Sequence, residues 1–222
     1  MKNENYSKLF VILCSLNITC LLISNVITVK TINIFGLIYT AADVIFPITY
    51  ILNDVFTEVY GFNKSRFVIW ISFFCNLLMV ILFQITIALP SNEQFEIQND
   101  LINIVGSTPR ILIASFISFL VGNFANSVLM SKMKVKTEGK YLALRTITST
   151  IVGEGLDTIL FVPLVFIGNL DLQNIIKLII DIYAFKVLLE VILTPVTYKI
   201  VNIIKNKENI DTFDSNIKYK VI

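Results

Sequence analysis

The chain has 222 residues, of which 55% are hydrophobic and 15% charged, with a mean hydropathy of +0.77 and a formal net charge of +2. Soluble domains carry about 25% charged residues, so this composition excludes a soluble globular enzyme and a disordered chain. The sequence contains no histidine, which removes Ser-His triads, histidine zinc sites and histidine proton relays from consideration.

Apolar runs of about 20 residues recur along the sequence, the length needed to cross a hydrocarbon core about 30 Å thick. We therefore expect an all-α fold, a polytopic membrane protein built as a six-helix transmembrane bundle. The predicted helices cover residues 9–29, 41–60, 67–89, 111–130, 146–167 and 178–202. The second is the least regular, because Asp43 lies near its start and Pro47 inside it, and a kink or a partly re-entrant segment is expected there.

The segments around the helices suggest how the chain is organised. Residues 1–204 are predicted to form one transmembrane domain, and residues 205–222 a polar cytoplasmic tail that we expect to be mobile. The connection at 90–109 mixes acidic and apolar residues and is predicted to lie as an amphipathic helix at the membrane interface. Most of the 18 Lys and Arg residues fall at one set of helix ends, which by the positive-inside rule places both termini in the cytoplasm.

Ionisable residues inside the predicted helices are the informative ones. They form three pairs spaced three or four residues apart, so that each pair lies on one helix face. The pairs are Asp54 with Glu58, Glu154 with Asp157, and Lys186 with Glu190. A charge at the bilayer centre costs about 2.5–3.5 kcal/mol. We therefore expect these side chains to face the bundle interior or a water-filled cavity.

Counting the rise along each helix brings most of these groups, together with Asn123 and Asn126, to one layer near the membrane midplane. One interpretation is a structural network in which Lys186 pairs with Glu190 or Asp157. The other is a binding site, because five acidic groups face a single lysine and a closed ion-pair network would balance its charges. An acidic excess suits a cationic or donor-rich ligand, or a coupling proton.

Other residues carry weaker signals. Candidate gate or outer-end contacts are Asn25, Lys30 and Arg145, the last at the start of a predicted helix from which it can reach inward. Candidate stacking residues for a planar ligand, or plain packing residues, are Phe46, Tyr50, Phe56 and Phe161. We expect no catalytic residue, metal ligand or cofactor.

Two segments of the sequence resemble a known family. Residues 46–61 read FPITYILNDVFTEVYG, and residues 145–158 read RTITSTIVGEGLDT. Together with Lys186, Glu190 and the Thr194-Pro195 pair, they resemble the signature segments of the queuosine precursor transporter family, also described as vitamin uptake transporters. The resemblance extends over all six predicted helices.

The resemblance implies a non-enzymatic integral protein of a prokaryotic plasma (inner) membrane that imports a 7-deazaguanine precursor of the tRNA base queuosine. Motif positions match at Asn25, Lys30, Asp54, Glu58, Asp157, Lys186 and Glu190. Two positions depart from the family pattern: Asn123 stands where Glu or Gln is common, and Glu154 where Gln is common. The implied substrate is 7-cyano-7-deazaguanine, 7-aminomethyl-7-deazaguanine or queuine.

The residues and the resemblance agree on the chemistry. A guanine-like edge presents adjacent N–H donors that one carboxylate can accept as a pair, and the ring carbonyl needs a donor. The candidate substrate-binding residues are Asp54, Glu58, Asn123, Asn126, Glu154, Asp157, Lys186 and Glu190. We expect a nucleobase-like small molecule and the lipid bilayer as partners, no nucleic acid, and leave a homo-oligomer open.

Three alternatives stay open at this point. The chain can be the substrate-capture subunit of a multi-component ATP-driven vitamin or nucleobase importer, whose ATPase would be a separate chain. It can be an intramembrane enzyme, although the missing histidines and the absence of a phosphatidyl transferase motif argue against that. It can also be a helix-bundle scaffold, which would tolerate neutral substitutions at Glu154 and Asp157.

Overall fold

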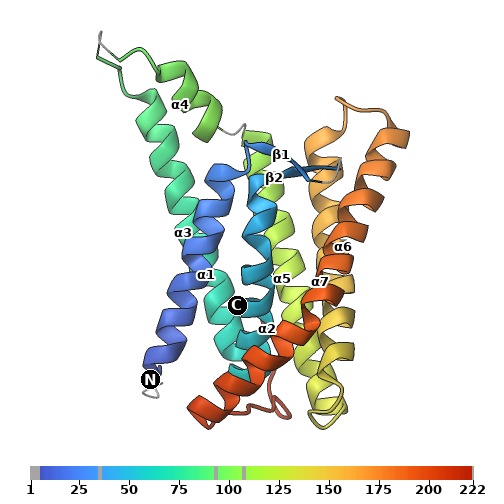
Figure 1. Cartoon of the computed structure of the whole chain (residues 1–222). Coiled ribbons are helices and arrows are strands. Elements are labelled where there is room, and N and C mark those ends of the chain that lie inside the picture. Colours follow the sequence, from blue (N-terminus) through green and yellow to red (C-terminus); the bar gives the residue numbers. More distant parts are fainter. Residues whose placement is uncertain (1–5, 35–36, 93–94, 107–108, 222) are drawn as a thin grey trace.

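The computed structural model describes residues 6–34, 37–92, 95–106 and 109–221. The fold is all-α apart from one short β-hairpin (Figure 1). The α-helices are α1 (Lys8–Ile27), α2 (Phe46–Tyr60), α3 (Phe62–Ala88), α4 (Gln98–Val105), α5 (Pro109–Lys136), α6 (Leu142–Phe166) and α7 (Leu172–Glu208). The hairpin pairs β1 (Thr31–Ile34) with β2 (Leu37–Thr40) in antiparallel register, and a 3₁₀ turn, η1 (Ala41–Val44), follows it.

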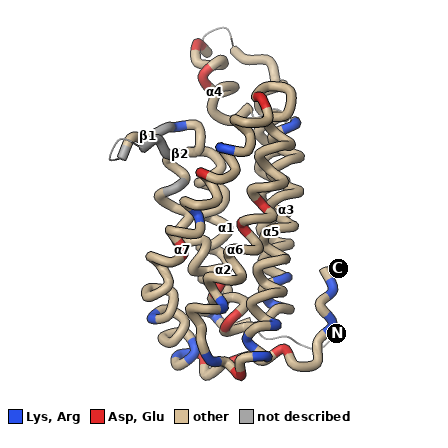
Figure 2. Tube along the Cα trace, turned by 90° about the vertical axis from the view of Figure 1, so that its right-hand side faces the viewer, with Lys and Arg blue, Asp and Glu red and all other residues tan. Residues whose placement is uncertain are grey.

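The long helices lie side by side, and the two ends of the bundle differ (Figure 1). The hairpin, α4 and the α6–α7 connection lie at one end, which we call the hairpin end. The α2–α3 junction, the α5–α6 connection and residues 209–221 lie at the other, the tail end. Lys and Arg residues gather toward the tail end (Figure 2).

Within the described parts of the chain, four candidate membrane spans are long and apolar enough to cross a membrane: Lys8–Ile27, Phe62–Ala88, the Gln98–Lys136 region that contains α4 and α5, and Leu142–Phe166. The protein is therefore an integral membrane protein. The remaining long helices, α2 and α7, carry Asp54, Glu58, Lys186 and Glu190. Two of the three ionisable pairs thus lie on the long helices that do not meet the criteria for a candidate span.

The second helix is shorter than the sequence predicted. It begins at Phe46 rather than at residue 41, and its 15 residues extend only about 22 Å at 1.5 Å per residue. The stretch before it forms β2 and η1, and Pro47 lies in the first turn of α2, where its missing N–H costs no helical hydrogen bond. The irregularity expected around Pro47 is therefore a helix start rather than a kink.

Helix α2 occupies the centre of the bundle, where it contacts α1, α3, α5 and α7. Its buried apolar residues, including Leu52, Val55 and Val59, join α1 and α7 in the main hydrophobic core. The acidic residues of α2 are thereby held among other helices instead of facing lipid.

The predicted tail begins inside a helix, because α7 continues to Glu208, and the residues after it return to the bundle. The Thr212 backbone N–H donates to the Val59 carbonyl at 3.1 Å. Asp214 is buried, and its Oδ2 accepts hydrogen bonds from the Phe62 N–H at 2.8 Å and the Ser131 hydroxyl at 2.5 Å. The tail thus closes over the α2–α3 junction.

Candidate functional site

Lys186 of α7 lies between two carboxylates of α6. Its Nζ is 2.8 Å from Glu154 Oε2 and 2.6 Å from Asp157 Oδ2. The sequence left Glu190 or Asp157 as its partner; the structure selects Asp157 and adds Glu154, while no ion pair joins Lys186 to Glu190 among the described residues. All three side chains are about one-fifth exposed (17–24%), so the triad is not sealed inside the protein.

Asp54 and Glu190 lie beside this triad and are far more deeply buried, at 1% and 2% exposure. Asp54 Oδ2 and Glu190 Oε1 have no hydrogen-bond partner among the described residues. Asp54 lies within electrostatic range of Glu190, and Glu190 within range of Glu154. We call Asp54, Glu154, Asp157, Lys186 and Glu190 the central cluster; it sets four carboxylates against one ammonium group.

Amide and hydroxyl groups border the central cluster. Asn53 Nδ2 donates to Asn123 Oδ1 at 3.0 Å, and Asn123 Nδ2 donates to the Phe119 carbonyl at 2.8 Å. Asn126 Oδ1 and Thr158 Oγ1 are buried without a partner in the described chain. The sequence analysis did not select Asn53 or Thr158. Asn53 directly precedes Asp54, and Thr158 directly follows Asp157.

The close crossing of α5 and α6 positions these groups. A Cβ atom on Gly153 would lie 2.7 Å from Asn126 Cβ, and one on Gly122 would lie 2.9 Å from Asp157 Cβ. Two glycines facing each other let the backbones approach, as small residues do between membrane helices. The approach places Asn126 of α5 directly beside the α6 turn that carries Glu154 and Asp157.

The aromatic candidates divide between the cluster and the core. Phe46 and Tyr50 stack with ring centroids 6.2 Å apart, and Tyr50 lies within electrostatic range of Lys186. Phe56 instead packs against Phe10 in the core, with centroids 5.7 Å apart. Of the rings in these contacts, Tyr50 is therefore the one that lies near Lys186 of the central cluster.

Glu58 does not join the central cluster in an ion pair, but is engaged toward the tail end. Its Oε1 lies 2.7 Å from Arg145 Nη2 and 2.7 Å from Lys205 Nζ, and Lys134 Nζ is 3.7 Å away. Glu58 and Arg145 are both fully buried. The predicted acidic excess thus separates into an unbalanced central cluster and a cation-rich group around Glu58.

The tail completes this second group. Lys134 Nζ donates to the Glu58 carbonyl at 2.5 Å, the Thr212 carbonyl at 2.8 Å and the Asp211 carboxylate. Lys205 Nζ is 2.9 Å from Asp211 Oδ1. Burial raises the pKa of Asp211, but the hydrogen bonds from Lys134 and Lys205 outweigh it and hold that pKa below its ordinary value. We call Glu58, Lys134, Arg145, Lys205 and Asp211 the tail-end ion cluster.

The three candidate gate or end contacts do not come together. Asn25 donates to Asn76 Oδ1 at 2.8 Å, which ties α1 to α3. Lys30 is exposed beside the hairpin, and its carbonyl accepts the Ala41 N–H at 2.8 Å. Arg145 lies at the opposite end of the bundle from Lys30 and is held by Glu58, the Lys140 carbonyl and the Thr137 hydroxyl.

Comparison with known proteins places this arrangement among transporters. Residues 40–200 match the model of the family described as "Putative vitamin uptake transporter". A Bacillus subtilis (strain 168) protein named "Probable queuosine precursor transporter" is 26% identical over 187 residues, which cover 83% of this chain and 81% of that protein. No solved structure matches the chain.

Proposed function

We propose that this chain, which belongs to the family of putative vitamin uptake transporters, carries a queuosine precursor of the 7-deazaguanine type into the cell. The name of the Bacillus subtilis relative supports the substrate class. The observation that carries the proposal is the central cluster, in which a buried carboxylate oxygen of Asp54 and one of Glu190 have no partner in the described part of the chain. Unpaired buried acceptors are costly, and a donor-rich substrate would satisfy them.

The cluster fits the hydrogen-bonding pattern of such a base. The two adjacent N–H donors of a guanine-like edge suit a single carboxylate, Asp54 or Glu190, as a bidentate acceptor. The ring carbonyl needs a donor, and Lys186 can supply one of its three N–H groups while Glu154 and Asp157 keep it in place. Asn126 Oδ1 is a further unpaired acceptor, and the Tyr50 ring offers a face on which the base can stack.

We place the protein across the plasma membrane of a prokaryote as six spans with both termini in the cytoplasm. The gathering of Lys and Arg toward the tail end supports this orientation (Figure 2). In this arrangement the short α2 crosses only part of the membrane, and the hairpin and η1 cover the rest of its path. Non-helical backbone at membrane depth is tolerated where other protein segments bury it.

In this orientation the tail-end ion cluster closes the cytoplasmic end of the pathway. Helices α2, α5, α6 and α7 each contribute one charged residue to it, and the tail adds Asp211. Release of the substrate then requires these ion pairs to separate. Alternating access in many transporters uses such rearrangement around a fixed central site.

Uptake measured through tRNA tests the proposal. A bacterial host lacking both precursor synthesis and its own importer would express the chain and receive each 7-deazaguanine precursor, or queuine, at low external concentration, with the matching salvage enzymes supplied. Queuosine in tRNA is then read from its altered mobility on a boronate gel. We expect a shift with at least one compound, and its loss in Glu190→Gln and Asp157→Asn.

A matched control variant shows whether a loss of uptake is specific to the central cluster. Glu96→Gln removes an exposed carboxylate outside the central cluster and should preserve uptake. Wild-type uptake by both cluster variants would contradict the proposed site, and no shift with any compound despite membrane insertion would contradict the substrate. Purified chain in proteoliposomes distinguishes the ATP-driven alternative, because a substrate-capture subunit alone would bind the precursor without accumulating it.

A further inference from the structure

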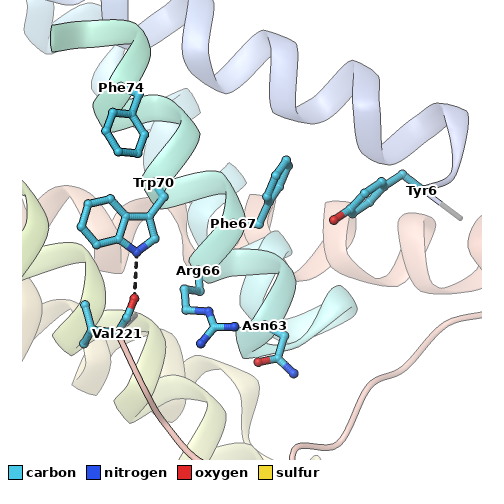
Figure 3. Close-up of a pocket in the computed structure, with 7 residues that line it drawn as sticks. All are labelled: Tyr6, Asn63, Arg66, Phe67, Trp70, Phe74 and Val221. Atoms are coloured by element: carbon cyan, nitrogen blue, oxygen red, sulfur yellow. Dashed lines mark hydrogen bonds between the residues drawn. The ribbon is translucent and has the colours of Figure 1, made fainter. Parts of the chain in front are cut away.

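A groove on the outer face of α3 has no role in the proposed transport step. Its cavity volume is about 620 Å³. Asn63, Arg66, Phe67, Trp70 and Phe74 line it along one stripe of the helix (Figure 3). Tyr6 and Val221 close its two sides, so the segment before α1 and the end of the tail both contribute (Figure 3).

The polar and apolar parts of the groove are separated along the helix axis. Asn63 and Arg66 lie in the first turns of α3 at the tail end, while Phe67, Trp70 and Phe74 follow toward the middle of the bundle. Phe67 and Phe74 are 41% and 57% exposed. A guanidinium followed by aromatic rings is the order in which a lipid presents its headgroup and its acyl chains at a membrane interface.

Arg66 is free to bind an anion. Its Nη1 donates to the Lys220 carbonyl at 2.9 Å, and no carboxylate of the described chain pairs with it or lines the groove. Arginine has five N–H donors in a planar fork that suits phosphate oxygens. Lys64 Nζ lies 5.8 Å from the ring centroid of Tyr6, which closes one side of the groove, so a second positive charge lies near that side.

A second groove, of about 510 Å³ at the hairpin end, is lined by an arginine that is engaged in backbone hydrogen bonds. There Arg110 donates from Nε to the Leu164 carbonyl at 2.6 Å and from Nη2 to the Ile167 carbonyl at 2.5 Å. That arginine ties α5 to the end of α6. In the α3 groove, Arg66 makes one such backbone hydrogen bond among the described residues, so more of its five N–H donors remain for a ligand.

We propose that the α3 groove binds an anionic phospholipid, with the phosphate on Arg66 and the acyl chains against Phe67, Trp70 and Phe74. The occupant follows from charge complementarity: a basic, aromatic-lined groove at the lysine-rich end of a membrane protein suits an anionic headgroup. Because Trp70 donates from Nε1 to the Val221 carbonyl at 2.8 Å and Arg66 holds Lys220, the bound lipid would also rest on the docked tail.

Trp70 provides a native fluorescence probe of this site, since it is the sole tryptophan in the sequence. The purified protein in detergent micelles would be titrated with phosphatidylglycerol or phosphatidylcholine carrying the same brominated acyl chains, and tryptophan fluorescence followed. Bromine quenches an indole only at short range. We expect half-maximal quenching at an about fivefold lower mole fraction of phosphatidylglycerol, the preference that one basic residue near a lipid surface supplies.

Arg66→Gln should remove the preference for phosphatidylglycerol while leaving the quenching by phosphatidylcholine unchanged. Lys199→Gln, which removes an exposed positive charge from α7 instead, is the matched control and should keep it. Inorganic phosphate should not reverse the quenching, because it lacks the acyl chains. Equal quenching of the wild-type protein by both lipids, or an unchanged preference in Arg66→Gln, would overturn the proposal, whatever the transported substrate is.

Discussion

Glu58 and Arg145 form an ion pair of 2.7 Å between α2 and α6 in which both side chains are fully buried. The two residues are 87 positions apart in the sequence. Burying two charges is unfavourable unless their remaining hydrogen-bonding groups are also satisfied. Here Lys205 shares the same Glu58 oxygen, and the Lys140 carbonyl and the Thr137 hydroxyl accept from Arg145, so the pair belongs to a network that joins helices to the tail. Glu58 Oε2 and Arg145 Nε have no hydrogen-bond partner among the described residues, so the network satisfies the pair only in part.

Arg145→Gln tests the contribution of this pair. Removing one partner of a buried ion pair costs about 3–5 kcal/mol; Lys205 and Lys134 remain near Glu58, so we expect the lower part of that range. The measurement is the midpoint of thermal unfolding of the purified protein in detergent. Lys199→Gln, at an exposed position of α7, is the charge-matched control, and equal midpoints for the two variants would show that the pair contributes nothing.

The crossing of α5 and α6 gives a second prediction. Gly153→Ala would place a Cβ 2.7 Å from Asn126 Cβ and 2.8 Å from the Gly122 carbonyl oxygen. Overpacking of this kind costs about 1–3 kcal/mol, and separating the helices would move Asn126 away from Glu154 and Asp157. We expect lower thermal stability together with loss of precursor uptake.

Gly155→Ala is the control for that substitution on the same helix. Its Cβ would meet Tyr183 Cε2 at 3.4 Å, an ordinary contact. Uptake and stability should both remain near the wild-type values. Ala has the higher helix propensity, so propensity alone would favour both variants. If Gly155→Ala were as damaging as Gly153→Ala, the close crossing at Gly153 would not explain the effect.

The ionisable residues of the central cluster can be picked out from the sequence because the cost of a charge in a membrane makes them conspicuous within apolar runs. Asp54, Glu190 and Lys186 are charged residues within apolar runs, and this is visible in the sequence without knowing how the helices pack. Their partners depend on tertiary packing, and so Lys186 was assigned to Glu190 or Asp157, whereas α6 brings Glu154 to it as well. Helical spacing places two residues on one face but does not say which neighbouring helix that face meets.

The two ends of the bundle were harder to predict for a related reason. Hydropathy marks the apolar part of a helix, whereas α5 and α7 continue to Lys136 and Glu208 through polar residues. The docking of the tail rests on Asp214, which binds the Phe62 N–H 152 positions away, and a polar segment gives no sign of such a distant partner. The β-hairpin before α2 was likewise missed, because its strands lie in the connection between the predicted helices 9–29 and 41–60.

Asp54→Asn separates binding from stability. The Asp54 side chain is 1% exposed with an unpartnered Oδ2, so neutralising it relieves the cost of burying a carboxylate without breaking an ion pair. We expect equal or higher thermal stability and at least about a tenfold loss of precursor uptake, since hydrogen bonds to a charged group contribute about 1.5–3 kcal/mol each. Loss of stability with normal uptake would show that Asp54 is structural.

The docking of the tail should depend on pH through Asp211. Its pKa in the folded protein is lowered, because the hydrogen bonds from Lys134 and Lys205 outweigh the effect of burial. A depressed folded-state pKa stabilises the docked form above the ordinary aspartate pKa of about 3.9, and the stabilisation is lost as the pH falls through the lowered value. The tail should therefore stay docked from neutral to mildly acidic pH. Limited proteolysis of residues 209–221 measures this directly: Asp211→Asn should speed cleavage at neutral pH, and cleavage of the wild type as fast as the variant would show that Asp211 does not hold the tail.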